Sequence, residues 1–121
     1  MKKYLILIMV AALAFELQEN AEAQIFNTKL RITVVDELGN VVPEAEVTLY
    51  ANEADYKALE NPVFETEKTD KKGRVTFKKL EQNEYYVRVV KDGMTNAGGG
   101  EIVSGLEIKK LNKANVVISE L

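Results

Sequence analysis

The stretch TDKKGRVTFKKLEQNEYYVRVVKDG, residues 69–93, decides the fold class because two turns punctuate two alternating runs. Residues 70–73 (DKKG) read as a turn with glycine in its last position, and residues 81–84 (EQNE) separate the two runs. Within each run apolar and polar residues alternate, and a period of two predicts half-buried β-strands. The side chains expected to face the core are Val75, Phe77, Tyr85, Val87 and Val89.

The same alternation continues on both sides of this stretch. Residues 30–36 (LRITVVD) and 45–51 (AEVTLYA) each place three apolar side chains on one face, and residues 63–70 and 106–121 supply the remaining strands. About seven short strands with turns between them predict an all-β fold, a seven-stranded Greek-key sandwich of immunoglobulin-like type. The inward-facing residues expected from these two runs are Leu30, Ile32, Val34, Ala45, Val47 and Leu49.

Two segments do not fit the strand pattern. Residues 52–62 (NEADYKALENP) are expected to form a long loop with a helical turn before the proline. Residues 94–105 contain three consecutive glycines and are expected to form a mobile surface loop. Binding residues often lie on loops that a rigid scaffold holds in place, so both segments are candidate binding loops.

The N-terminus has the features of an exported protein. A basic start (MKK) precedes an apolar run at residues 4–15, and Ala21-Glu22-Ala23 has the small-x-small pattern of a signal-peptidase site. This order predicts a signal-peptide helix over residues 1–23, and a mature protein of one domain over residues 24–121. The apolar run is shorter than the roughly 20 residues that span a bilayer. We therefore expect a periplasmic or secreted protein with no transmembrane segment after cleavage.

Composition excludes several kinds of chemistry. The chain has no cysteine and no histidine, so it lacks disulfides, thiol nucleophiles, a lipid-attachment cysteine and the commonest general base. Its net charge of −3 indicates no basic surface for nucleic acid. Asp36, Glu37 and Asp70 stand at turns, where a carboxylate caps the backbone, and calcium binding by Asp36, Asn40 or Asp70 is the alternative. The expectation is a protein that is not an enzyme and needs no cofactor or metal.

A family resemblance agrees with this interpretation. Residues 30–93 resemble carboxypeptidase regulatory-like domains, which have a transthyretin-like (prealbumin-like) sandwich fold and are mostly non-catalytic accessory modules. The segments 54–63 and 96–100 resemble a variant found among small exported proteins of Bacteroidetes-type bacteria. One departure is Asn83, which stands where the family usually has a glycine before the central tyrosine. The residues that carry the resemblance are Asp36, Gly39, Pro43, Ala45, Thr69, Asp70, Gly73, Val75, Phe77, Leu80, Tyr85, Val87, Val89 and Gly93.

Related surface sandwiches sometimes contain a Lys–Asn isopeptide bond that a buried acid assists. Lys29 and Asn115 are the pair that this chain would offer. The place expected for the acid is held by Val89, which cannot polarise an amide. The bond is therefore not expected.

The tyrosines are the remaining ligand candidates. Tyr50 and Tyr86 are expected to point outward from the sheet, Tyr56 lies in the first candidate loop, and Asn96 lies in the second. We interpret the chain as a non-enzymatic binding or structural module with an unknown protein or glycan partner at the cell envelope. The alternative is a carbohydrate-binding module that uses the exposed tyrosines and the end loops.

Overall fold

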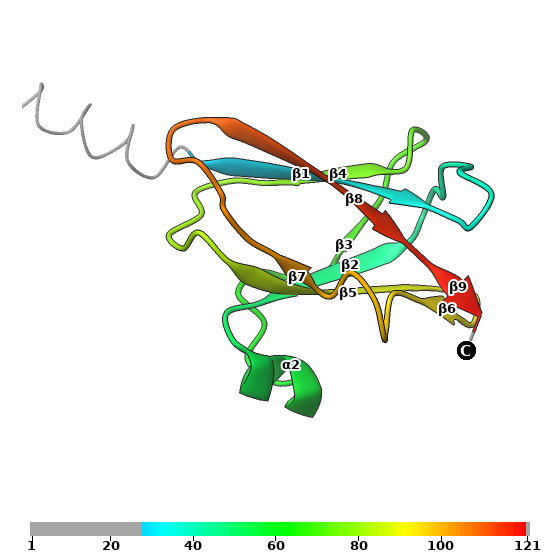
Figure 1. Cartoon of the computed structure of the whole chain (residues 1–121), viewed down its shortest axis with the longest axis horizontal. Coiled ribbons are helices and arrows are strands. Elements are labelled where there is room, and N and C mark those ends of the chain that lie inside the picture. Colours follow the sequence, from blue (N-terminus) through cyan, green and yellow to red (C-terminus); the bar gives the residue numbers. More distant parts are fainter. Residues whose placement is uncertain (1–27, 121) are drawn as a thin grey trace, which may run out of the picture.

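The computed structural model describes residues 28–120, which form two facing β-sheets with one short helix outside them (Figure 1). The smaller sheet has the order β4-β1-β8, and the larger has the order β3-β2-β5-β6-β9, with β7 also paired to β5. The strands are β1 (Lys29–Val35), β2 (Glu46–Tyr50), β3 (Glu67–Lys68), β4 (Arg74–Phe77), β5 (Tyr85–Lys91), β6 (Met94–Thr95), β7 (Ile102–Val103), β8 (Leu111–Val117) and β9 (Ser119–Glu120). The helix is α2 (Glu53–Ala58).

Strand β1 is the centre of the smaller sheet. It pairs antiparallel with β4, where Leu30 lies opposite Phe77, and parallel with β8, where Ile32 lies beside Ala114. The parallel pairing joins segments about eighty positions apart in sequence, so the C-terminal strand completes a sheet that the first strand begins. In the larger sheet β2 and β5 pair antiparallel, with Leu49 opposite Val87.

The core lies between the two sheets, as the alternation predicts. The expected inward side chains of β1, β2 and β5 are almost completely buried, as is Phe77 of β4. Phe77 also packs against Phe64, with ring centroids 5.7 Å apart. Val75 is only partly buried and packs against the edge of this core. The all-β sandwich expected from the sequence is therefore confirmed.

The structure differs from the sequence prediction in its strand ends. The described residues contain nine strands, of which β3, β6, β7 and β9 have two residues each. Residues 63–66, expected to be strand, are mostly irregular, and the expected mobile loop at 94–105 contains both β6 and β7. Alternation alone misses such short pairings because two residues show no period. The expected helical turn at 52–62 is confirmed as α2.

The turns follow the chemistry that the sequence predicts for aspartate. Asp36 Oδ1 accepts hydrogen bonds from the backbone N–H groups of Leu38 and Asn40, at 2.9 Å each. Asp70 Oδ1 accepts in the same way from Lys72 and Arg74, at 2.8 and 3.1 Å. The hydrogen bond from the Arg74 backbone N–H, and then the one from Lys72, hold the pKa of the Asp70 carboxyl below its usual range. Both carboxylates therefore stabilise turns.

Tyr85 has the buried position expected for it. Its ring is 1% exposed, and its hydroxyl oxygen accepts hydrogen bonds from the backbone N–H groups of Glu81 and Gln82, both at 3.1 Å. Tyr85 therefore joins the core to the turn before β5. Within residues 28–120, no helix is long and apolar enough to cross a membrane. The predicted signal peptide, residues 1–23, lies outside the described residues.

Candidate functional site

Three of the candidate tyrosines come together on the outer face of the larger sheet. Tyr50 of β2 lies directly opposite Tyr86 of β5, and Tyr56 of α2 packs on both of them. The Tyr56 ring meets Tyr50 edge-on, with centroids 5.9 Å apart, and is tilted against Tyr86 at 5.7 Å. We refer to Tyr50, Tyr56 and Tyr86 as the tyrosine cluster.

The structure corrects the expectation that Tyr50 is exposed. Tyr50 does point away from the core, as parity predicts, but it is only 4% exposed because α2 and its ring Tyr56 cover that end of the sheet. Thr48, also on this face, is buried and hydrogen-bonds to Thr66 at 2.7 Å between the two hydroxyl oxygens. The segment that covers Tyr50 is a loop and a helix, and the alternation within the strands does not predict where this segment lies.

Tyr56 is half-buried, and it attaches α2 to the sheet. The helix begins at the cap Asn52, whose Oδ1 accepts from the Asp55 backbone N–H at 2.9 Å, and ends at Leu59 in the left-handed region. Partial burial, and then the negative charge of Glu101, raise the pKa of the Tyr56 hydroxyl. None of the helix residues is fully buried. Tyr56 and Tyr86 are thus the members of the cluster that a partner can reach.

Asn96 does not have the role expected from the sequence. It is 2% exposed, and its Oδ1 accepts from the Val89 backbone N–H at 2.9 Å. Its Nδ2 donates to the Val87 carbonyl at 2.8 Å and to the Gly100 carbonyl at 3.3 Å. The side chain therefore supplies hydrogen-bond partners to the part of the β5 backbone that lies between its pairings with β6 and β7. Asn96 holds the glycine-rich loop in place and is not an exposed ligand.

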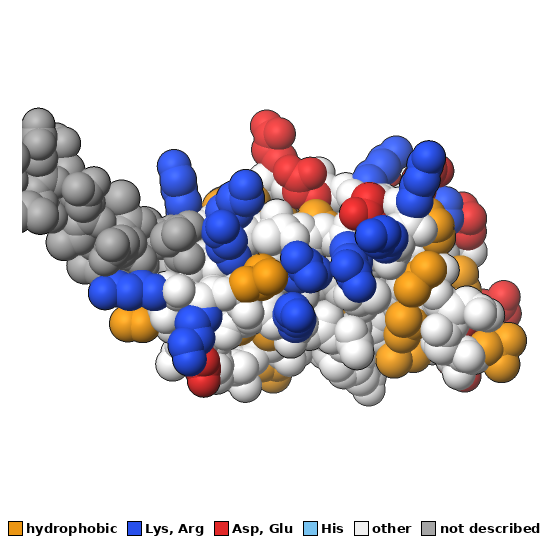
Figure 2. Space-filling view, turned by 90° about the horizontal axis from the view of Figure 1, so that it is seen from above, with side chains coloured by type: hydrophobic (Ala, Val, Ile, Leu, Met, Phe, Trp, Pro, Cys, Tyr) orange, Lys and Arg blue, Asp and Glu red, His pale blue; other side chains and the backbone are white. Residues whose placement is uncertain are grey.

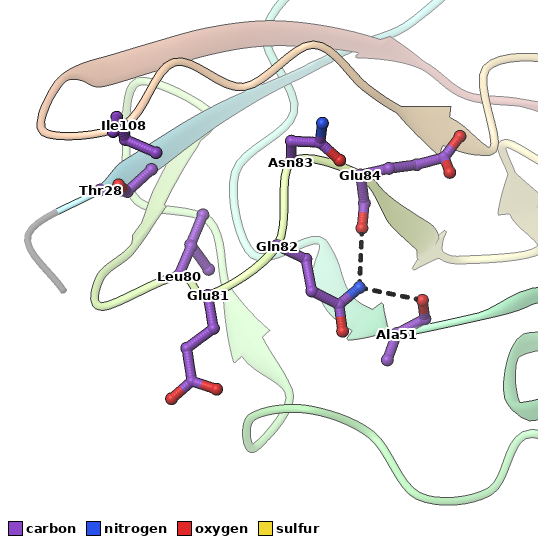
Figure 3. A pocket seen from close by; sticks show the side chains of 8 residues that line it. All are labelled: Thr28, Ala51, Leu80, Glu81, Gln82, Asn83, Glu84 and Ile108. Carbon is purple, nitrogen blue, oxygen red and sulfur yellow. Dashed lines mark hydrogen bonds between the residues drawn. The ribbon is translucent and has the colours of Figure 1, made fainter. Parts of the chain in front are cut away.

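A hollow of about 700 Å³ lies at one end of the sandwich (Figure 3). Gln82 closes one side of it, because its Nε2 donates to the carbonyl oxygens of Ala51 and Glu84, both at 3.1 Å. The carboxylate of Glu81 points away from Thr28 and Ile108 (Figure 3). The lining residues are Thr28, Ala51, Leu80, Glu81, Gln82, Asn83, Glu84 and Ile108.

Sequence reasoning missed this hollow. Its walls come from the start of β1, the end of β2, the turn at 80–84 and the segment before β8, which are separate in sequence. The part of the hollow that the sequence indicates is the turn at residues 81–84, which separates the two alternating runs. No pattern in the sequence shows that Ile108 lies beside that turn.

Two further chemistries named from the sequence are an isopeptide bond and metal binding. Asn115 lies beside Thr33 in the β1–β8 register, whereas Lys29 lies beside Leu111. Four residues along a strand separate Lys29 from Asn115 by roughly 13 Å, which is too far for a bond between them. Among residues 28–120, no three acidic side chains come together in a way that could hold a metal ion.

The site as a whole offers shape, aromatic edges and hydrogen-bonding groups. The full sequence has no histidine or cysteine to act as base or nucleophile. The Asp36 and Asp70 carboxylates already accept backbone hydrogen bonds. The aromatic rings and hydrogen-bonding groups of this arrangement are suited to contact with a partner.

The two sheets, their order and the buried Tyr85 define a β-sandwich of the prealbumin-like class. Residues 28–92 match the family described as SpaA, prealbumin-like fold domain, and the chain belongs to this family. The family match ends before β8, although β8 completes the smaller sheet.

Solved structures agree with this class. The Bacillus anthracis TIE protein is similar at 28% identity and a TM-score of 0.53, over 77% of this chain and 17% of that one. A Streptococcal ancillary pilin is similar at 20% identity and a TM-score of 0.56, over 79% and 33% of the two chains. BcpA, the major pilin subunit of Bacillus cereus, is similar at 15% identity and a TM-score of 0.51, over 78% and 30%.

The two pilin likenesses show the fold alone, because their sequence identities are low. The chain spans between about a sixth and a third of the length of these solved chains. No curated protein matches the sequence.

Proposed function

We propose that this protein is an exported, non-enzymatic β-sandwich that acts as a structural or accessory binding module at the cell surface. The observation that carries the proposal is the family match over residues 28–92, in a fold that surface pilins also contain. The absence of histidine and cysteine, and the use of turn carboxylates as caps, support a role without catalysis. We further propose that, among proteins with the prealbumin-like fold, this chain is a carboxypeptidase regulatory-like domain.

The proposed partner is a protein, and the proposed contact surface surrounds α2. Tyr56 and Tyr86 are half-buried there, and Ile102 lies opposite Tyr86 in the β5–β7 register with 50% of its surface exposed. Leu59, directly after the helix, is 53% exposed. We call Tyr56, Leu59, Tyr86 and Ile102 the α2 surface. Aromatic and aliphatic side chains grouped in this way are typical of the centre of a protein interface.

A photo-cross-linking amino acid in place of Lys57 on α2 tests this surface in intact cells. Irradiation is expected to join the mature protein to another protein, and Leu59→Ser with Ile102→Ser is expected to abolish the adduct. The matched control is Leu38→Ser with Val117→Ser, which removes two apolar side chains that are 87% and 50% exposed elsewhere. Equal adducts in both double variants, or none in the wild type, would contradict the proposed surface.

The alternative is a carbohydrate-binding module. Tyr56 and Tyr86 keep partly exposed rings, which can lie against a sugar. Tyr50 and Asn96 are buried, so the set of four candidates offers only two residues to a glycan. A glycan array probed with the mature protein separates the two functions, because binding that Tyr56→Ala removes would favour the glycan.

The proposed domain organisation is a signal peptide at residues 1–23 and one domain at 24–121. The basic start, the apolar run and Ala21-Glu22-Ala23 support it. The intact mass of protein isolated from the envelope or the medium is expected to correspond to a chain that begins at Gln24. A species that retains residues 1–23 would contradict the proposed cleavage.

A further inference from the structure

Cationic side chains gather on the outer face of the smaller sheet. In β1 the residues that alternate with the buried Leu30, Ile32 and Val34 point away from the core, and these include Lys29 and Arg31. The corresponding outward residues of the neighbouring strands are Arg74 of β4 and Lys113 of β8. Lys29, Arg31, Arg74 and Lys113 form what we call the basic sheet face. Figure 2 looks down on this side of the molecule and shows Lys and Arg side chains spread across it.

The strand register places these charges close together. Arg31 has Lys113 beside it on β8 and Thr76 opposite it on β4, and Thr33 lies between Arg74 and Asn115. Neighbouring strands are about 4.8 Å apart, and alternate residues of one strand about 6.6 Å apart. All four cations therefore lie within roughly one Debye length of a neighbour at physiological salt, so their fields add together.

No acidic residue lies on strands β1, β4 or β8. Among the residues that the structure describes, none of the four cations has a carboxylate within ion-pair distance. Asp70 shares a groove with Arg31 and Arg74, and its carboxylate offsets part of their positive charge. The strands of this face therefore carry four cations and no carboxylate.

Protection of sheet edges does not explain this arrangement. Lysines on edge strands discourage pairing with other chains, and Lys113 on β8 fits that role. Lys29 and Arg31, however, stand on β1, which has a partner on each side. Like charges side by side on a sheet repel each other, so Arg31 beside Lys113 lowers the stability of the sheet. An arrangement that costs stability at a central strand indicates a binding role.

We propose that the basic sheet face binds a linear acidic polysaccharide that carries carboxylate groups. Lys29, Arg31, Arg74 and Lys113 would bind the carboxylates, and the planar fork of arginine fits a carboxylate with two hydrogen bonds. The hydroxyl and amide groups of Thr33, Thr76 and Asn115 lie between the cations and can both donate to and accept from sugar hydroxyls. The outward residues of these strands include no aromatic side chain, which disfavours stacking of single-stranded nucleic acid bases.

This proposal concerns a face of the molecule opposite α2 and does not depend on the proposed protein partner (Figure 1). The test is binding of the mature protein to fluorescein-labelled polygalacturonate, followed by fluorescence anisotropy at 50 and 200 mM NaCl. The expected result is saturable binding whose affinity falls at least tenfold between the two salt concentrations, because several ion contacts form together.

The diagnostic variant is Arg74→Gln with Lys113→Gln, two exposed residues on the strands that flank β1. It is expected to weaken binding at 50 mM NaCl at least tenfold and to flatten the salt dependence. The matched control is Lys57→Gln with Lys68→Gln, which removes the same charge from α2 and β3 and is expected to change affinity less than twofold. Circular dichroism and thermal melting check that both double variants fold.

Parallel measurements with polyphosphate, duplex DNA and vesicles of anionic lipid distinguish other anions. Tighter binding to any of these than to polygalacturonate would overturn the assignment of a carboxylate polysaccharide. Equal loss of affinity in the control variant would overturn the location. Self-association at 50 mM NaCl that Arg74→Gln with Lys113→Gln abolishes would show instead that a second copy of the chain occupies this face.

Discussion

The Asn96 side chain makes backbone hydrogen bonds to β5 that a neighbouring strand would otherwise make. β6 pairs with residues 90 and 91 of β5, and β7 pairs with residues 85 and 86, which leaves the segment between them without a neighbouring strand. The Asn96 amide occupies that place, accepting from Val89 and donating to Val87. The three glycines can then leave the sheet as an exposed loop, because the backbone of β5 is already satisfied.

Asn96→Ala is expected to lower the free energy of unfolding by about 2–4 kcal/mol, since it leaves a buried N–H and a buried carbonyl without partners. Chemical denaturation monitored by circular dichroism measures the change. Asn83→Ala, at an exposed asparagine in the turn before β5, is the control and should cost less than about 0.5 kcal/mol. Similar losses in both variants would show that the Asn96 hydrogen bonds add nothing to stability.

Gly73 is a residue for which both the backbone and the surroundings require glycine. Its φ is +71°, and a Cβ added there would lie 2.9 Å from the Val34 carbonyl oxygen and 2.9 Å from the Val41 Cβ. Gly73→Ala is expected to cost at least about 2 kcal/mol. Gly39, in the Asp36 turn, has a φ of +85° with nothing within 4 Å of an added Cβ.

Gly39→Ala therefore isolates the cost of the backbone conformation, expected to be about 1 kcal/mol. Thermal denaturation of Gly39→Ala and Gly73→Ala separates the cost of the backbone conformation from the cost of the steric contacts. A Gly39→Ala variant that melts as low as Gly73→Ala would mean that the contacts with Val34 and Val41 cost nothing.

Among the individual elements, strand β4 has side chains that alternate between the core and the solvent. Phe77 is 3% exposed and packs on Phe64, whereas its neighbour Thr76 is exposed beside Arg31 on the basic sheet face. The two side chains share a backbone and differ in the face of the sheet that they occupy. A pair of truncations at these positions therefore tests the register of the whole strand.

Phe77→Ala is expected to cost about 3–5 kcal/mol through the cavity that it leaves. In a domain whose total stability is of the order of 5–15 kcal/mol, this loss can unfold a large fraction of the protein. Thr76→Ala is expected to cost well under about 1 kcal/mol. Urea denaturation midpoints give the comparison, and equal shifts would show that β4 has the opposite register.

At the scale of the whole molecule, the fold extends beyond the segment that matches the family. Residues 28–92 include β1, β4, β2 and β5, but β8 pairs with β1 along seven positions and brings Val116 to the core, followed by Ile118. Val116 and Ile118 are 2% and 0% exposed. Without β8 the smaller sheet would keep only β1 and β4, and a two-stranded sheet is marginal in water.

A chain truncated after Asp92 is therefore expected to show no cooperative thermal transition. A chain that ends at Ile118 keeps β8 and its core residues and is expected to fold, with a lower melting temperature because β9 is lost. Circular dichroism melting curves of the two chains make the comparison. Cooperative unfolding of the shorter chain would show that residues 28–92 suffice.

Charge distribution is also a property of the whole molecule that composition conceals. The net charge of −3 indicates no basic surface for nucleic acid, but it does not show that Lys29, Arg31, Arg74 and Lys113 share the outer face of β4-β1-β8. Arg31, Arg74 and Lys113 are far apart in sequence and come together only through strand register. The acidic residues that balance them lie on other elements, including Glu53 and Asp55 in the first turn of α2.

The side chains of each strand that face the core can be predicted from the sequence, because alternation depends only on the geometry of one extended backbone. The sequence also determined the Asp36 and Asp70 turns, since an aspartate caps a backbone N–H two to four residues away. The sequence does not predict that α2 covers Tyr50, that Asn96 hydrogen-bonds to β5, or that four cations share one face. These features depend on contacts between segments that are distant in sequence. The alternation of residues within one strand does not show what covers the outer face of a sheet.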